Sequence, residues 1–203
     1  MSDSRWTRWY KAVLIGDGAV GKTSLKRNYL GEDFMEGHLP TIGVDFAQKT
    51  IEYETGTVKF IIWDLAGQPS FERVRRHYYQ GANGIFLVYS VNDRKSFDNA
   101  TKWLVEAYRY MGSLPPTIVI ANKVDLRPTD HGESMISTEE GIRFASFYRE
   151  RMEVPTSFRE TSALTGEGVQ DAFSELISLM SETGEVNIPE QAEVRKTSSE
   201  TKI

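Results

Sequence analysis

The sequence contains no cysteine among its 203 residues. A disulfide framework, a thiolate metal site and a cysteine nucleophile are therefore excluded. Prenyl and palmitoyl anchors are excluded as well, because both are attached to cysteine, and Ser2 stands where N-myristoylation requires a glycine. We accordingly expect no direct lipid anchor on this chain.

The sequence also lacks long apolar runs and an excess of positive charge. The sequence has no run of about 18 apolar residues that could span a membrane, and it has no signal-peptide core followed by a cleavage site. The net charge is −5, whereas nucleic-acid-binding domains usually carry a basic excess. These absences predict a cytoplasmic protein with no nucleic-acid partner, which reaches membranes only by recruitment through a protein partner.

The composition suits one globular domain with a sizeable core. Charged residues make up 26% of the chain and hydrophobic residues 39%. We expect an N-terminal extension at residues 1–9, a domain at residues 10–180 and a flexible acidic tail at residues 181–203. The tail contains no aromatic residue and cannot bury enough apolar surface to offset its ordering entropy.

Short apolar runs alternate with helical patterns along the predicted domain. Residues 12–15, 85–89 and 118–121 are continuous apolar runs, which are typical of parallel strands buried on both faces. Residues 44–53 and 58–63 flank a Glu-Thr-Gly-Thr turn and predict a hairpin.

Helices are predicted over residues 95–111, from Ser137 onward, and around an apolar stripe near the end of the domain. Ser137 and Glu140 have the spacing of a capping box. The stripe consists of Val169, Phe173, Leu176, Ile177 and Met180. The order of elements predicts an α/β doubly wound sheet, mostly parallel with one antiparallel hairpin strand, whose ligand lies at the carboxyl ends of the strands.

The strongest motif is Gly-Asp-Gly-Ala-Val-Gly-Lys-Thr at residues 16–23, which follows the first strand and precedes a helical pattern. This context favours a phosphate-binding P-loop over a chance glycine turn. Lys22 would reach the β- and γ-phosphates, and the Thr23 hydroxyl would bind Mg²⁺. Backbone N–H groups would surround the phosphates. The nucleotide-binding residues predicted here are Gly18, Ala19, Val20, Gly21, Lys22, Thr23 and Ser24.

A second motif selects among nucleotides. Asn122, Lys123 and Asp125 follow the strand at residues 118–121, where the ligand crevice is expected. A carboxylate can accept hydrogen bonds from N1–H and the exocyclic amine of guanine, and adenine has no such donor pair. The motif therefore favours GTP or GDP over the ligand of a P-loop ATPase or kinase, although a polar turn after a strand is common.

Two further segments follow predicted strands. Asp64 is placed to hold Mg²⁺, Gly67 to offer its N–H to the γ-phosphate, and Gln68 to orient an attacking water. A turn with Asp64 as a cap is the alternative. Ser162, Ala163 and Leu164 follow another short strand. Their N–H groups could meet guanine, and a helix-capping role is an equal alternative.

These motifs, in this order and spacing, resemble those of the Ras superfamily of small GTPases over about residues 10–180. Phe34 and Thr41 have the family spacing of a guanine-stacking aromatic and the metal-binding threonine of switch I. The sequence around Thr41 and Trp63 is most similar to the Rab branch. Phe46, Trp63 and Tyr78 match the apolar triad through which Rab proteins meet effectors, with ordinary core packing as the alternative. In lacking a lipid-modified cysteine, the chain resembles prokaryotic, including archaeal, Ras-like GTPases.

The resemblance implies a monomeric Rab-like switch that binds GTP or GDP with Mg²⁺ and hydrolyses GTP slowly. It also implies protein effectors, an exchange factor and a GTPase-activating protein. Pro69 departs from the family pattern, because the family usually has an acidic residue after the glutamine. Proline biases Gln68 away from the helical region. It is also the feature that favours the alternative of a non-hydrolysing guanine-nucleotide scaffold. Arg73, Arg75 and Arg76 are interpreted as helix-surface charges.

Overall fold

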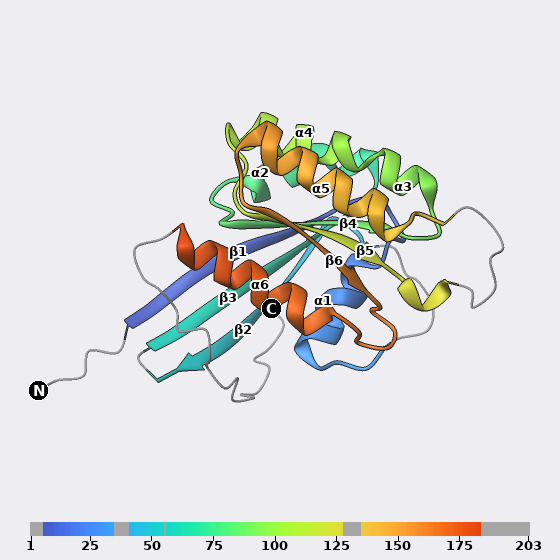
Figure 1. The fold of residues 1–203 in the computed structure, drawn as a ribbon. Coiled ribbons are helices and arrows are strands. Elements are labelled where there is room, and N and C mark those ends of the chain that lie inside the picture. Colours follow the sequence, from blue (N-terminus) through green and yellow to red (C-terminus); the bar gives the residue numbers. More distant parts are fainter. Residues whose placement is uncertain (1–5, 35–40, 55, 128–134, 184–203) are drawn as a thin grey trace, which may run out of the picture.

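The computed structural model describes residues 6–34, 41–54, 56–127 and 135–183. A six-stranded sheet lies at its centre, in the order β2-β3-β1-β4-β5-β6 (Figure 1). The strands are β1 (Trp6–Ile15), β2 (Val44–Tyr53), β3 (Gly56–Leu65), β4 (Gly84–Ser90), β5 (Thr117–Asn122) and β6 (Thr156–Thr161). β2 pairs with β3 antiparallel and every other pair is parallel, which confirms the predicted sheet.

Helices cover both faces of the sheet and enclose two apolar cores (Figure 1). α1 (Lys22–Leu30) and α6 (Val169–Glu182) pack on one face, and the predicted apolar stripe of α6 is buried there. The second core joins the other face to α2 (Glu72–Tyr79), α4 (Ala100–Met111) and α5 (Thr138–Met152). No helix among the described residues is long and apolar enough to cross a membrane.

The helix boundaries follow the sequence expectations in part. The helix predicted over residues 95–111 is divided at Asn99 into α3 (Arg94–Asp98) and α4. The capping box of α5 is confirmed, since Glu140 N–H donates to Ser137 Oγ at 3.2 Å and Ser137 N–H donates to the Glu140 carboxylate at 3.0 Å. Single turns of 3-10 helix at Pro69–Phe71 and Val124–Leu126 follow β3 and β5.

The first strand begins earlier than the apolar run predicts. Trp6–Ile15 form one strand, and its first four residues pair with the start of β3 from Gly56 onward. The boundary expected between residues 9 and 10 thus falls inside β1, because the long hairpin partner gives Trp6 and its neighbours a strand to pair with. Residues 1–5 and the predicted tail from residue 184 lie outside the described residues.

Candidate nucleotide-binding site

The loop at residues 16–21 joins the carboxyl end of β1 to the start of α1 and packs tightly on two neighbouring strands. Gly16 has φ 137°, and a Cβ there would lie 2.1 Å from the carbonyl oxygen of Val88. Gly21 has φ 100°, and a Cβ there would lie 2.3 Å from Asn122 Nδ2. Both positions therefore require glycine. Gly18, in contrast, has open space around its Cβ position, with no heavy atom within 4 Å.

Lys22 lies within this loop with its amine almost fully buried. Its Nζ donates to the carbonyl oxygens of Gly16 at 2.8 Å and Asp17 at 2.7 Å. Burial lowers the pKa of Lys22 to about 8, against the opposing effect of the nearby Asp64 and Asp17 carboxylates. Two carbonyls of the loop thus hold the Lys22 amine inside the predicted phosphate-binding loop.

Nucleotide affinity is expected to fall as the pH rises above 8. Below that pH the Lys22 amine is already charged, whereas above it phosphate binding must take up a proton, so affinity falls by up to about tenfold per pH unit. Displacement of a fluorescent GDP analogue between pH 7 and 9 measures this. Lys22→Arg should give a flatter profile, because guanidinium does not titrate there and both proteins share any titration of the nucleotide itself. Identical profiles would contradict the expectation.

The three predicted metal ligands converge beside this lysine. The Thr23 hydroxyl donates to Asp64 Oδ2, and its oxygen lies 2.9 Å from that of Thr41. Asp64 is fully buried, and its other oxygen, Oδ1, has no hydrogen-bond partner among the described residues. Burial raises the pKa of Asp64. Two hydroxyls and a carboxylate oxygen left without a partner are the hard oxygen donors that Mg²⁺ prefers, so these residues fit that ion.

Asn122 ties three loops together at the end of β5. Its Nδ2 donates to the carbonyl of Val20 at 2.8 Å. Its Oδ1 accepts from Thr161 Oγ1 at 3.0 Å and from the Ala163 N–H at 3.2 Å. Asn122 therefore joins the phosphate loop to the end of β6 and to the loop that follows it. Its contact with a nucleotide stays a prediction.

The residues predicted to recognise the base lie on the loops that Asn122 joins. Asp125 is exposed and accepts a hydrogen bond from the Ser162 hydroxyl. Lys123 has φ 68°, and burial lowers the pKa of its amine. Leu164 is exposed, whereas Ala163 is buried. Phe34, the predicted stacking aromatic, belongs to a different segment, the one that follows α1, and is exposed.

The segment after β3 lies directly against the phosphate loop. A Cβ at Gly67 would come within 2.5 Å of backbone atoms of Asp17 and Gly18. Gln68 has φ −82° and ψ 141°, and Pro69 begins a 3-10 turn, so the predicted effect of proline on Gln68 is confirmed. The backbone of this segment therefore lies against the loop that is predicted to bind phosphates.

The interpretation of Arg75 as a surface charge is wrong. Its side chain is 2% exposed and donates from Nη1 to the carbonyls of Ala66 at 2.9 Å and Gln68 at 2.7 Å. Its Nε and Nη2 both bond to the Glu106 carboxylate at 2.8 Å. Arg75 therefore fastens the segment that carries Gln68 to helix α4. The sequence could have indicated this burial, because Arg75 lies one helical turn before the buried Tyr79 and so shares its face of α2.

A second contact that the sequence did not predict joins the phosphate loop to the same helix. Asp17 accepts from Asn99 Nδ2 at 2.8 Å and from Trp103 Nε1 at 2.7 Å. The Arg75 guanidinium lies 4.6 Å from the centre of the Trp103 ring, a cation–π distance. Helix α4 thus holds both the phosphate loop and the Gln68 segment from one side.

The three aromatic residues predicted as an effector surface lie together. The ring centres of Phe46 and Trp63 are 4.9 Å apart, and those of Trp63 and Tyr78 are 4.8 Å apart. Phe46 is 48% exposed, while Trp63 and Tyr78 are partly buried and pack against the second core. The group is therefore neither wholly core nor wholly surface.

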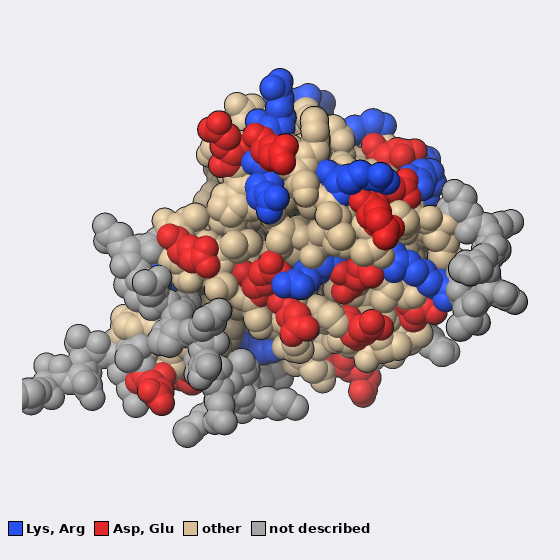
Figure 2. Space-filling model, viewed as in Figure 1, with Lys and Arg blue, Asp and Glu red and all other residues tan. Residues whose placement is uncertain are grey.

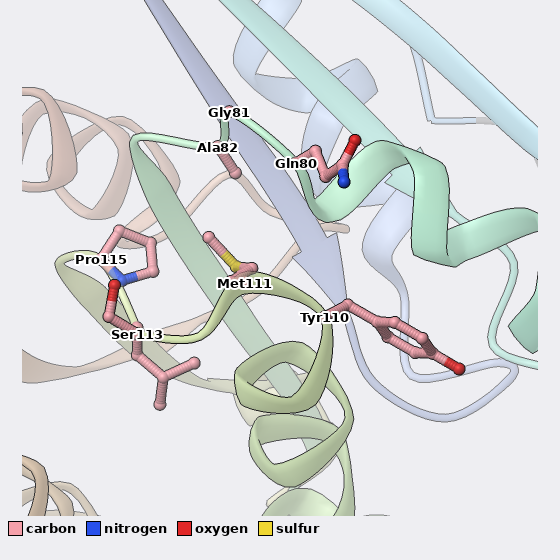
Figure 3. A pocket seen from close by; sticks show the side chains of 8 residues that line it. Gln80, Gly81, Ala82, Tyr110, Met111, Ser113 and Pro115 are labelled. Atoms are coloured by element: carbon pink, nitrogen blue, oxygen red, sulfur yellow. The ribbon is translucent and has the colours of Figure 1, made fainter.

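A separate pocket of about 360 Å³ lies at the other end of the strands, where β4 and β5 begin (Figure 3). It is formed where the chain enters β4 and β5, and its lining includes Gln80, Ala82, Tyr110, Met111 and Pro115. In a doubly wound fold the ligand binds at the carboxyl ends of the parallel strands, not at their amino ends. The nucleotide site is thus distinct from this pocket.

A phosphate loop, a buried carboxylate with two hydroxyls beside it, and loops joined by Asn122 all meet at the carboxyl ends of the strands. This arrangement defines a P-loop nucleotide-binding domain of the α/β class.

Comparison with known proteins places the chain more narrowly. A sequence model of the Ras family matches residues 11–182. The chain is 38% identical to GTP-binding protein YPTM2 of Zea mays over 164 residues, which are 81% of this chain and 76% of the maize protein. It is 37% identical to Ras-related protein RABD2c of Arabidopsis thaliana, with the same coverage. It is 34% identical to Ras-related protein Rab-15 of Rattus norvegicus over 171 residues, or 84% of this chain and 76% of the rat protein. The chain therefore belongs to the Ras family of small GTPases, within its Rab branch, and is a GTP-hydrolysing enzyme.

Proposed function

We propose that the site binds GTP and GDP together with Mg²⁺, hydrolyses GTP slowly, and signals its nucleotide state to protein effectors. The observation that carries this proposal is the convergence of Thr41 and Asp64 on Thr23, from 18 and 41 residues further along the chain. This oxygen cluster lies beside the loop that holds Lys22. A phosphate-bound divalent cation is the ligand that such a combination suits.

Each part of the nucleotide has residues suited to it. The N–H groups of residues 18–24 and the Lys22 amine would surround the phosphates. Asp125 would accept from the guanine edge, while Phe34 and Leu164 would pack on the base. Thr23, Thr41 and Asp64 would hold Mg²⁺, which when bound neutralises charge that develops on the phosphate oxygens.

Hydrolysis would depend on positioning a water rather than on covalent chemistry. Gln68 would orient that water, and the Gly67 N–H would donate to the γ-phosphate. Slow turnover is expected because Arg75 is engaged by Glu106 and two backbone carbonyls and cannot serve as an arginine finger. A GTPase-activating protein would supply the missing charge.

The same contacts would make the protein a switch. A γ-phosphate would hold Thr41 and Gly67 and order both segments, and hydrolysis would release them. Effectors would bind the surface at Phe46, Trp63 and Tyr78, and an exchange factor would replace GDP with GTP. The protein would act as a monomer in the cytoplasm, where a protein partner would recruit it to membranes.

The nucleotide released on denaturation of the purified, Mg²⁺-containing protein tests the binding part of this proposal. Chromatography should identify GDP or GTP in near-stoichiometric amount. An adenine nucleotide would contradict the role given to Asp125. Predominant GTP would indicate binding without efficient hydrolysis, and an empty site would indicate weak affinity.

Gln68→Leu is expected to slow GTP hydrolysis at least about tenfold while leaving GDP affinity unchanged, because the water loses its orienting group. Phosphate release from preloaded GTP in a single turnover measures the rate. Gln80→Leu is the matched control, since Gln80 is exposed and, in the described part of the chain, its hydrogen bond is made by its backbone carbonyl, which accepts from Lys11. An unchanged rate in Gln68→Leu would remove Gln68 from the mechanism.

A further inference from the structure

Gly67 has no side chain that could fix its own position, and it lies between two groups of contacts that do. A Cβ at Gly67 would come within 2.5 Å of backbone atoms of the phosphate loop, so its backbone packs directly on that loop. The carbonyls before and after it, those of Ala66 and Gln68, both accept from Arg75 Nη1. The position of the Gly67 N–H therefore depends on the phosphate loop on one side and on Arg75 on the other.

Trp103 joins these two supports. Its Nε1 donates to Asp17 Oδ1 at 2.7 Å, and the Arg75 guanidinium lies 4.6 Å from the centre of its ring. The Trp103 side chain is buried, and polar attractions are stronger where water is largely excluded. The contacts thus form a closed chain, which runs from the phosphate loop through Trp103 and Arg75 to the segment around Gly67 and back to the loop.

Asp17 is held through both its side chain and its backbone. Its Oδ2 accepts from Asn99 Nδ2 at 2.8 Å, while its carbonyl accepts from Lys22 Nζ at 2.7 Å. Asn99 and Trp103 lie one helical turn apart at the start of α4, so one rigid element presents both donors to the Asp17 carboxylate. The phosphate loop is therefore fixed relative to α4 at the residue against which Gly67 packs.

We propose that Asp17 and Trp103 are positioning residues for GTP hydrolysis, because their hydrogen bond sets the phosphate loop against the Gly67–Gln68 segment. The inference rests on the proposed function, in which the Gly67 N–H meets the γ-phosphate and Gln68 orients the water. Both positioning residues act through the backbone, since the Asp17 carboxylate is bonded to donors on α4. A shift of about 1 Å at a reacting group can slow a reaction about a hundredfold, so small displacements matter here.

The effect should be confined to GTP. GDP lacks the phosphate that the Gly67 N–H would meet, so a displaced Gly67 takes no such contact away from GDP. An interaction that serves the reacting state changes the rate rather than the ground-state affinity. A purely structural role predicts the reverse, with lower stability and an unchanged rate in the folded protein.

Single-turnover phosphate release from preloaded GTP tests the proposal, on the full chain and at a temperature where each variant is folded. Trp103→Phe keeps a ring beside Arg75 but removes the Nε1 donor, and Asp17→Ala removes the acceptor. Each should slow hydrolysis about tenfold, and Trp103→Phe should change GDP affinity less than about threefold. An unchanged rate in Trp103→Phe overturns the proposal.

Asp17→Asn is the conservative variant and should recover most of the rate lost in Asp17→Ala. Its side-chain oxygen still accepts from Trp103 Nε1, and its amide can bond to the amide of Asn99. Thermal unfolding of the GDP-loaded proteins gives the stability of each variant for comparison. Equal rates in the asparagine and alanine variants, or rates that follow stability alone, overturn the proposal.

The double variant with Asp17→Ala and Trp103→Phe distinguishes one shared contact from two separate effects. Residues that act through the same hydrogen bond are not additive, so the double variant should be about as slow as the slower single variant. Effects that multiply, to a rate about a hundredfold below that of the original chain, overturn the proposal.

The indole N–H signal of Trp103 in a ¹⁵N-labelled sample reports the bond directly. Trp103→Phe identifies this signal by removing it. A hydrogen bond to a carboxylate is short and charge-assisted, so the signal should move upfield in Asp17→Ala and less far in Asp17→Asn. A signal that stays in place in Asp17→Ala overturns the contact on which the proposal depends.

Trp9→Phe and Asp171→Ala are the matched controls. Trp9 is exposed on β1, and Asp171 is exposed on α6. Acidic and basic side chains lie interspersed on the face of the molecule seen in Figure 2, so the loss of one surface charge should leave the site unchanged. Both controls should hydrolyse GTP at the original rate, and equal slowing in them overturns the proposal.

Failure of the proposed function gives a different result. If the original chain binds GTP without hydrolysing it, or if Gln68→Leu hydrolyses at the original rate, the proposed function is overturned and this inference with it. If Gln68→Leu is slow and Trp103→Phe is not, the inference alone is overturned.

Discussion

Replacement of Arg75 by alanine is expected to lower the free energy of unfolding by about 3–5 kcal/mol, as for other buried ion pairs that lose one partner. The Arg75 side chain is 2% exposed, and the Glu106 side chain is 15% exposed. Without the guanidinium, the Glu106 carboxylate keeps only the Tyr79 hydroxyl as a donor, at 2.9 Å, among the bonds described. The carbonyls of Ala66 and Gln68 also lose their shared donor.

Urea unfolding of the GDP-loaded proteins at one GDP concentration measures this change. Arg73→Ala on the same helix is the control, and as an exposed substitution it should change stability by less than about 0.5 kcal/mol. Arg75→Lys should fall between the two, because an ammonium cannot bond in parallel to both Glu106 oxygens. Equal effects of the two alanine substitutions would refute the expectation.

The same variants separate positioning from stability. Arg75 donates a hydrogen bond to the carbonyl of Gln68. We therefore expect Arg75→Lys to slow hydrolysis, with GDP affinity retained, at a temperature where the variant is fully folded. Glu106→Gln keeps the shape of the Arg75 partner and should slow hydrolysis less than Arg75→Lys does. A rate that follows stability alone across the series would show that Arg75 acts only in folding.

The contrast between Arg75 and the phosphate loop shows what sequence could predict. Residues 16–23 are contiguous, so their spacing alone specifies a local backbone shape. Three arginines within residues 73–76 look alike in composition, and only the phase of α2 against the core separates buried Arg75 from exposed Arg73 and Arg76. That phase was readable from Tyr79, but the partner Glu106 lies on another helix 31 residues away.

For Asn122, likewise, the sequence predicted its location but not its hydrogen-bond partners. Its position after β5 predicted that it would lie at the site. Its partners Val20, in the phosphate loop, and Thr161, the last residue of β6, lie 102 and 39 residues away, so the contacts depend on how the strand ends meet. The early start of β1 is another tertiary effect, because Trp6–Trp9 have no alternating apolar pattern of their own and become a strand by pairing with β3.

Asp64→Asn is expected to stabilise the protein when it is free of metal and nucleotide, and to abolish the stabilisation that Mg²⁺ provides. Asp64 is fully buried, and its Oδ1 has no partner among the described residues. An unpaired buried polar group costs about 1–3 kcal/mol, and more when it is charged. Asparagine keeps the shape and an acceptor for the Thr23 hydroxyl but removes the charge.

Thermal unfolding with and without Mg²⁺ measures both effects in one experiment. The original protein should gain stability with rising Mg²⁺ according to the affinity of the site, and Asp64→Asn should show no gain. Asp171→Asn, which removes a carboxylate from the surface of α6, should behave as the original protein does. A loss of stability in metal-free Asp64→Asn would mean that the carboxylate stabilises the fold itself. The expected pattern instead means that the buried Oδ1 of Asp64, which has no partner among the described residues, costs stability in the empty protein, and that this cost is offset only when a cation binds.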